Sequence, residues 1–177
     1  MREASISGAM MFGTFSAFWS TLVFFLESPV YHLGTRTAGL FGLVGVAGAL
    51  AASIVGRTTD RKSPRFTLSI AIVLSTLSYI CFLTLGFRIW GLIIGVILLD
   101  IGIQAAQISN QARIYALSAA AHNRINSIFM VSYFMGGAAG SFFGSYSWAL
   151  FGWKGVCFVG LLFQMGAIAV HLIHHKK

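Results

Sequence analysis

Six long apolar stretches, separated by short polar connections, dominate the 177-residue sequence. Each reaches about 20 residues, the length that an α-helix needs to cross the hydrocarbon core of a bilayer. We expect these helices at residues 4–26, 37–55, 66–87, 89–112, 125–150 and 152–173. The short alternating segments that a membrane β-barrel requires do not occur in the sequence. The sequence therefore predicts an all-α membrane protein whose six transmembrane helices form a single domain.

The composition excludes most other classes of protein. Hydrophobic residues make up 57% of the chain and charged residues only 9%, against roughly 25% charged in a typical soluble domain. A soluble domain of this length could not bury so much apolar surface. A net charge of +8 can indicate nucleic-acid binding, but here the basic residues lie between apolar stretches. The lipid bilayer is the expected partner, and nucleic acid is not.

The distribution of lysine and arginine predicts that both termini are cytoplasmic, because loops rich in these residues stay on the cytoplasmic side. With this orientation, nine basic residues are cytoplasmic and three lie on the other side. The nine are Arg2, Arg57, Arg61, Lys62, Arg65, Arg113, Arg124, Lys176 and Lys177, and the three are Arg36, Arg88 and Lys154.

The stretch at residues 98–117 carries the most unusual polar residues. Asp100, Gln104, Gln107 and Gln111 are spaced by four, three and four residues, so they share one face of a helix. Asp100 follows Arg88 by 12 residues, about 18 Å along a helix and therefore near the bilayer midplane. An ionised carboxylate there costs roughly 2.5 to 3.5 kcal/mol, and no lysine or arginine lies at that depth. Asp100 is either a proton-coupling or substrate-binding group, or a neutral acid hydrogen-bonded to neighbouring helices.

Aromatic and glycine residues give two weaker indications. Phe15 and Trp19 lie in the middle of the first stretch, where aromatic rings can line a cavity for an apolar solute or pack against other helices. Gly136, Gly140 and Gly144 recur every four residues, so they form a stripe against which another helix can pack closely. Such a stripe serves either as a fixed packing contact or as a sliding surface in a protein that changes shape.

Nothing in the sequence predicts an enzyme, a cofactor or a metal site. The Gly-x-Ser-x-Gly turn of a serine hydrolase does not occur. Cys81 and Cys157 lie in apolar stretches and are expected to act as small hydrophobic residues. His171, His174 and His175 are expected to form a solvated tail at the cytoplasmic end, in preference to a metal site.

The connection GRTTDRKSPR contains a recognisable signature. Gly56, Asp60, Arg61 and Arg65 resemble the cytoplasmic loop motif of the major facilitator superfamily, Gly-x-x-x-Asp-Arg/Lys-x-Gly-Arg/Lys-Arg/Lys, with departures at positions 63 and 64. The resemblance implies that Asp60 and Arg61 help to hold a cytoplasmic gate closed. A simple positively charged cytoplasmic loop is the alternative interpretation.

Three further segments, at residues 15–45, 98–117 and 132–158, resemble the C-terminal six helices of bacterial major facilitator transporters, nearest to the drug and sugar efflux branch. With the loop motif, the resemblance covers essentially the whole chain. It implies a half-bundle of two inverted three-helix repeats, with substrate bound at the midplane between two such halves. By helix position, it places five side chains along the transport path: Phe15, Trp19, Asp100, Gln104 and Gln107.

The resemblance implies half of a secondary active transporter, a proton-coupled exporter of small organic solutes in the bacterial inner membrane. The expected partner is an N-terminal six-helix half, from the same gene or a separate one, or a second copy of this chain. Arg2, Glu3 and Ala4 resemble the end of a linker between two halves. The alternative is a truncated remnant or scaffold subunit that transports nothing and assembles with another membrane protein.

Overall fold

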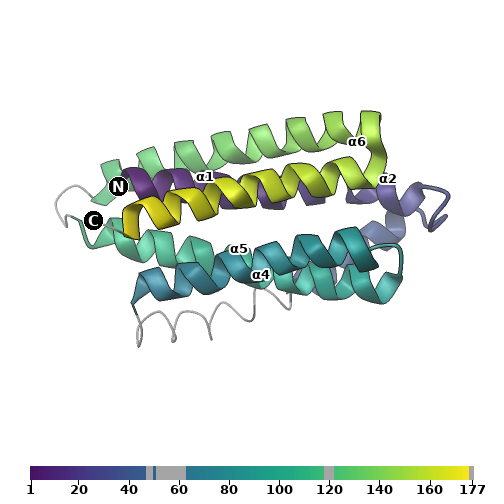
Figure 1. Ribbon diagram of the computed structural model, residues 1–177, viewed down its shortest axis with the longest axis horizontal. Helices are drawn as coiled ribbons and strands as arrows, with labels where there is room; N and C mark the ends of the chain where they lie inside the picture. The colour runs from purple at the N-terminus through teal and green to yellow at the C-terminus, as the bar shows by residue number, and fades with distance from the viewer. Residues whose placement is uncertain (47–49, 51–62, 118–121, 176–177) are drawn as a thin grey trace.

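The computed structural model describes residues 1–46, 50, 63–117 and 122–175, and the regular secondary structure in these ranges is helical. The helices are α1 (Arg2–Trp19), α2 (Leu22–Glu27), α4 (Pro64–Leu85), α5 (Ile89–Tyr115) and α6 (His122–His175). Residues 35–46 are also helical. The long helices follow the longest axis of the molecule, and both termini lie at the same end (Figure 1). The prediction of an all-helical chain is confirmed for the described residues.

Four stretches among the described residues are long and apolar enough to cross a membrane: Arg2–Glu27, Pro64–Leu85, Ile89–Tyr115 and Asn123–Ile173. The last has 51 residues, which as a straight helix would extend about 77 Å, more than twice the roughly 30 Å of hydrocarbon in a bilayer. Its backbone leaves the helical conformation at Gly152, where φ is 61° and ψ is −149°. Glycine adopts this conformation without steric cost. The helix folds back there into two antiparallel arms (Figure 1).

We call residues 122–151 the first arm and residues 153–175 the second arm of α6. The sequence placed a helix boundary at residue 151, next to this reversal. The predicted helix at 66–87 begins earlier in the structure, at Pro64, because Ser63 caps it and accepts a hydrogen bond from the Phe66 backbone N–H at 3.3 Å. Of the predicted helix at 37–55, the structure describes the part up to residue 46 and residue 50.

The predicted helix at 4–26 is interrupted between α1 and α2. The hydroxyl group of Thr21 donates to the backbone carbonyl of Ala17 at 2.8 Å, and that of Ser20 donates to Ser16 at 2.7 Å. Such side-chain bonds compete with the helical hydrogen bonds of the backbone. The chain therefore leaves regular α-helical geometry for two residues and resumes it at Leu22.

α1 packs against α6 through small residues on both helices. A Cβ atom added at the glycines of α6 would meet the α1 backbone, so these helices approach one another closely. The contacts pair Gly136 with Ala9, Gly140 with Gly13 and Gly144 with Ala17. The glycine stripe noted in the sequence therefore faces α1 in the structure.

An aromatic cluster connects α1 and α2 with α4 and α6 near one end of the molecule. The rings of Phe18 and Phe82 stack with centroids 4.4 Å apart, and those of Phe25 and Trp153 stack at 3.9 Å. The indole N–H of Trp153 also donates to the backbone carbonyl of Phe82 at 3.0 Å. These buried rings fix the position of α1 relative to α4.

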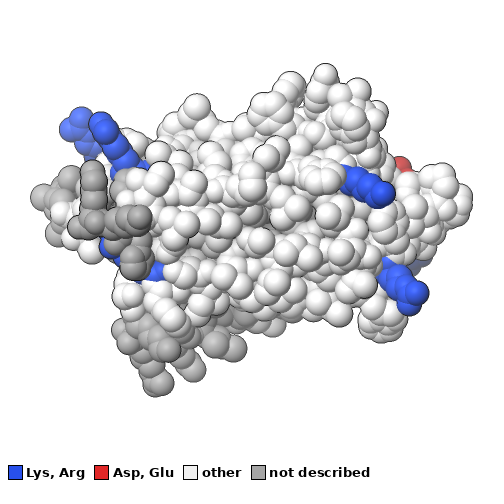
Figure 2. Space-filling model, viewed as in Figure 1, with Lys and Arg blue, Asp and Glu red and all other residues white. Residues whose placement is uncertain are grey.

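The surface has the charge distribution of a membrane-spanning bundle. In Figure 2, lysine and arginine side chains lie near the two ends of the long axis, and the face between them carries no described charged side chain. Large apolar side chains are exposed along the helices, among them Val73, Phe134 and Leu162. A hydrocarbon layer can cover such a belt without leaving charged groups unsolvated.

Candidate functional site

A cavity of about 350 Å³ lies between α1, residues 35–46, α5 and the first arm of α6. It brings together the five side chains that the family resemblance grouped by helix position. The lining residues are Phe12, Phe15, Trp19, Gly42, Gly45, Asp100, Ile103, Gln104, Gln107 and Tyr133. The lining is therefore aromatic where α1 contributes to it and polar where α5 does.

The polar wall belongs to α5. Asp100, Gln104 and Gln107 reach the same cavity because their spacing puts them on one face of the helix. The helix at residues 35–46 packs close to the Asp100 side chain. A Cβ atom added at Gly45 would lie 2.9 Å from the Asp100 Oδ2 atom and 3.5 Å from the ring of Trp19. Glycine at position 45 thus leaves space for the carboxyl group.

Asp100 is buried, with only 6% of its surface exposed. The indole N–H of Trp19 lies beside its carboxyl group, but the two do not reach hydrogen-bond geometry. Asp100 Oδ2 and Trp19 Nε1 both lack a hydrogen-bond partner among the described residues. Within the same part of the chain, no lysine or arginine lines the cavity or forms an ion pair with Asp100. A buried carboxyl group in this state can accept a proton or bind a cationic group.

Phe12 and Tyr133 are among the lining residues that the sequence analysis did not place in the cavity. The rings of Phe12 and Tyr133 stack with centroids 4.1 Å apart and an angle of 14° between their planes, and the Tyr133 hydroxyl donates to Gln107 Oε1 at 3.4 Å. Phe12 precedes Phe15 by three residues, so helical spacing could have placed it on the same face. Tyr133 has no comparable signal in the sequence.

The predicted gate loop is only partly described. Gly56, Asp60 and Arg61 lie outside the described residues. Arg65, in the first turn of α4, has 48% of its side chain exposed, and its Nη2 atom lies 3.7 Å from Glu3 Oε2. An interaction of Arg65 with α1 was not expected from the loop motif.

Glu3 joins three helices at the end of the molecule that carries the termini. Its Oε2 atom also accepts a hydrogen bond from Arg113 on α5, and its side chain is buried. Glu3 had been interpreted only as part of a linker-like segment. The sequence did offer a signal: the chain has only four acidic residues, and Glu3 lies at the start of a long apolar stretch. An acid that is buried there requires a basic partner.

The C-terminal histidines require one correction. His171 is not solvated but buried, and its Nε2 atom lies 2.8 Å from the Ser69 hydroxyl of α4. The prediction of a solvated tail is therefore wrong for this residue, because the second arm of α6 remains helical and packs against α4. In the described part of the chain, histidine, cysteine and acidic residues form no group of three that could hold a metal ion.

Long apolar helices and a buried polar cavity between them define the class of this molecule, an α-helical integral membrane protein. Two relatives of the chain are named as transporters. Over 160 residues, or 90% of the chain, it is 36% identical to a protein of Escherichia coli O157:H7 named "Uncharacterized transporter YgaY". Over 158 residues, or 89% of the chain, it is 31% identical to "Probable transporter SCO4007" of Streptomyces coelicolor.

The matches cover only part of those relatives. The aligned region spans 41% of the Escherichia coli protein and 36% of the Streptomyces protein. No family model matches the chain, and no solved structure does. The chain is thus homologous to a segment that makes up less than half the length of each of these two relatives, both of which are named as transporters.

Proposed function

We propose that this chain forms one six-helix half of a secondary active transporter of the major facilitator type, which exports small organic solutes in exchange for protons. It acts by transport and not by enzymatic catalysis. The observation that carries the proposal is the buried carboxyl group of Asp100, which faces a cavity and has no cationic partner among the described residues. Relatives named as transporters support the same class of activity.

The cavity supplies the two kinds of surface that a solute site needs. Phe12, Phe15 and Trp19 offer apolar area and aromatic faces, and Asp100 offers one negative charge when ionised. Aromatic faces and a carboxylate both attract cations. A cationic aromatic solute and a proton would then compete for Asp100, and this competition couples export of the solute to entry of the proton.

The six crossings in this proposal are α1 with α2, the helix that the sequence predicts at 37–55, α4, α5 and the two arms of α6. The match to less than half of each relative supports a second half as partner. A second copy of this chain is the other arrangement that would close the cavity. Alternating access would then arise from rocking of the two halves around Asp100.

The orientation in the proposal has both termini in the cytoplasm of a bacterial cell, with the bundle in the inner membrane. Arg2 begins α1, and Arg65 and Arg113 contact Glu3 near the same end, which carries both termini (Figure 1). In the sequence, the connections and termini that hold these arginines also contain the basic residues at 57, 61, 62, 124, 176 and 177, and the positive-inside rule assigns such segments to the cytoplasm. Glu3, Arg65 and Arg113 would contribute to the cytoplasmic gate.

Flux measurements on the whole protein in sealed vesicles test this function. Ethidium, a cationic aromatic dye, serves as the solute, and an imposed pH gradient drives its movement. We expect flux that depends on the gradient in the native protein and none above background in Asp100→Asn. The matched control is Glu27→Gln, which also replaces an acid by its amide but at an exposed position outside the cavity.

The results distinguish the transporter from its alternatives. Gradient-dependent flux that Asp100→Asn leaves unchanged would contradict the role of Asp100. If no probe moves and the protein instead copurifies with a different membrane protein, the chain is a scaffold subunit or remnant. Cysteine cross-linking within the membrane identifies the partner as a six-helix half or a second copy.

A further inference from the structure

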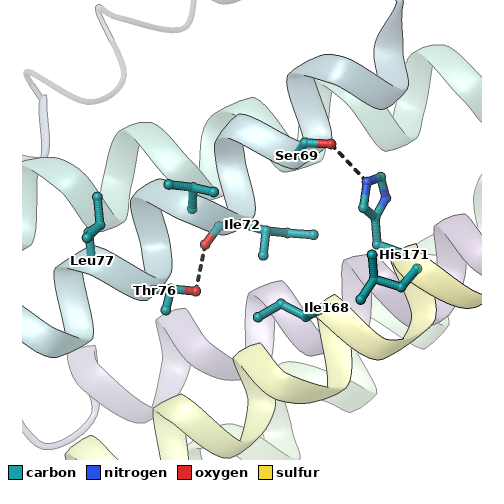
Figure 3. Close-up of a pocket in the computed structure, with 8 residues that line it drawn as sticks. Ser69, Ile72, Thr76, Leu77, Ile168 and His171 are labelled. Atoms are coloured by element: carbon teal, nitrogen blue, oxygen red, sulfur yellow. Dashed lines mark hydrogen bonds between the residues drawn. The ribbon is translucent and has the colours of Figure 1, made fainter. Parts of the chain in front are cut away.

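A second and larger hollow lies outside the polar cavity, between α4 and the second arm of α6. Its volume is about 540 Å³, within the range of small-molecule sites. Its walls are mostly apolar, and both α4 and the second arm of α6 contribute to them (Figure 3). The lining residues are Ser69, Ile72, Val73, Thr76, Leu77, Ile168, His171 and Leu172. We call this hollow the α4–α6 groove.

The groove faces the lipid side of the bundle. Val73, Leu77 and Leu172 are exposed, and 56% of the Val73 surface is accessible. Both walls belong to stretches long and apolar enough to cross a membrane. In a bilayer, the material that reaches such a surface is the acyl chain of a lipid.

One end of the groove is polar. Figure 3 shows Ser69 and His171 pointing toward each other across the groove, with 2.8 Å between Ser69 Oγ and His171 Nε2. Ser69 also donates to the backbone carbonyl of Arg65, one helical turn earlier, at 3.1 Å. Arg65 therefore continues the groove-facing row of α4 toward the end of the molecule.

The charges at this end favour an anion. Arg65 and Arg113 share a single carboxylate, that of Glu3, so these three described side chains together carry a surplus of one positive charge. Arg65 is the more distant and more exposed of the two arginines. In the described part of the chain, no acidic residue lines the groove. Basic side chains at the membrane interface, beside a space between helices, bind the phosphate groups of anionic lipids.

We propose that the α4–α6 groove holds one acyl chain of an anionic phospholipid, whose phosphate group binds Arg65. The apolar walls contact the acyl chain, and Ser69 and His171 mark the depth at which the ester region of the lipid begins. Lipid occupancy would hold α4 and the second arm of α6 at a fixed separation. The inference requires insertion in a membrane, but neither transport nor an ionisable Asp100.

Native mass spectrometry of the whole protein, titrated with dioleoyl-phosphatidylglycerol or dioleoyl-phosphatidylcholine, tests the proposal. The two lipids have identical chains and differ in head-group charge. We expect about fivefold tighter binding of phosphatidylglycerol, since one interfacial arginine contributes about 1 kcal/mol. Arg65→Gln should remove this preference, whereas Arg88→Gln, an exposed arginine at the opposite end, should leave it intact.

The acyl-chain contact is tested separately by Val73→Trp, which places a larger side chain in the groove at an exposed position. We expect weaker binding of both lipids. The control is Leu162→Trp, an exposed position in another apolar hollow with no charged lining residue. Equal affinity for the two lipids in the native protein, or a preference that survives Arg65→Gln, would overturn the proposal. So would equal effects of the two tryptophan substitutions.

This experiment is independent of the proposed function. A protein that binds phosphatidylglycerol selectively but moves no solute would retain the lipid site and lose the transporter assignment. A protein that moves solute but binds the two lipids equally would retain the transporter assignment and lose the lipid site.

Discussion

The hydroxyl group of Tyr79 on α4 donates a hydrogen bond to the backbone carbonyl of Thr14 on α1, with 2.6 Å between the two oxygens. The bond is buried and connects helices that are 65 residues apart in the chain. Gly160 of the second arm of α6 leaves room for the same ring, and Gln164 donates to Thr14 Oγ1 at 3.2 Å. Tyr79 thus joins α1, α4 and α6 at one point.

Replacement of Tyr79 by phenylalanine removes this bond and leaves the ring in place. We expect Tyr79→Phe to lower the free energy of unfolding by about 1 kcal/mol, measured by denaturant titration in detergent micelles. Tyr146→Phe is the matched control, because Tyr146 is exposed on the first arm of α6. Equal stability of both variants would show that the Tyr79 bond contributes nothing.

The contact between α1 and α6 is expected to be intolerant of added volume. A methyl group at Gly140 would collide with the backbone of Gly13, so Gly140→Ala should destabilise the protein by about 1 to 3 kcal/mol. The control is Gly39→Ala, where a Cβ atom meets nothing within 4 Å. That substitution should be neutral or slightly stabilising, since alanine favours the helix. Thermal unfolding of both variants measures the difference.

The shared carboxylate of Glu3 is expected to be costly to remove. Glu3→Gln leaves the partly buried guanidinium of Arg113 without its ion pair, which should cost about 3 kcal/mol of stability. The double variant Glu3→Gln with Arg113→Gln should recover part of this loss, because the partly buried charge of Arg113 is then removed as well and Arg65, the other partner of Glu3, is half exposed. A double-mutant cycle measures the coupling, and additive effects would contradict an ion pair in solution.

Tyr31, in the connection after α2, provides a pH-dependent observable. Burial raises the pKa of its phenol from 10.0 to about 12, and its hydroxyl donates to the Gly86 carbonyl at 2.6 Å. Between pH 10 and 12, the folded state therefore keeps a proton that the unfolded state loses, so stability should fall as the pH rises through this window. Comparison with Tyr31→Phe isolates the effect, because that variant should lack this contribution to the pH dependence.

Periodicity in the sequence was sufficient to predict the features that depend on local spacing. The polar stripe of α5 shares one face because four-residue and three-residue steps return to the same side of a helix, and three of its four members, Asp100, Gln104 and Gln107, line one cavity. The helical class of the long stretches likewise follows from their length and apolar composition. The predicted boundary at residue 151 lies next to the observed reversal, although the prediction included Gly152 in the last helix.

Contacts between distant residues could not be predicted in the same way. Glu3 and Arg113 are 110 residues apart, and Ser69 and His171 are 102 apart. Whether a terminal acid or histidine is buried depends on which helix packs beside it, and one sequence carries no information on that choice. The polar side chains of Ser20 and Thr21 were likewise too few to signal the interruption between α1 and α2.

The reversal at Gly152 constrains how the last part of the chain enters a membrane. Only one residue separates the arms of α6. In the proposed six-crossing arrangement, the two arms would therefore insert as a single hairpin, with their outer ends, His122 and His175, on the same side of the bilayer. Any tag or protease site engineered at position 152 would separate arms that otherwise insert together.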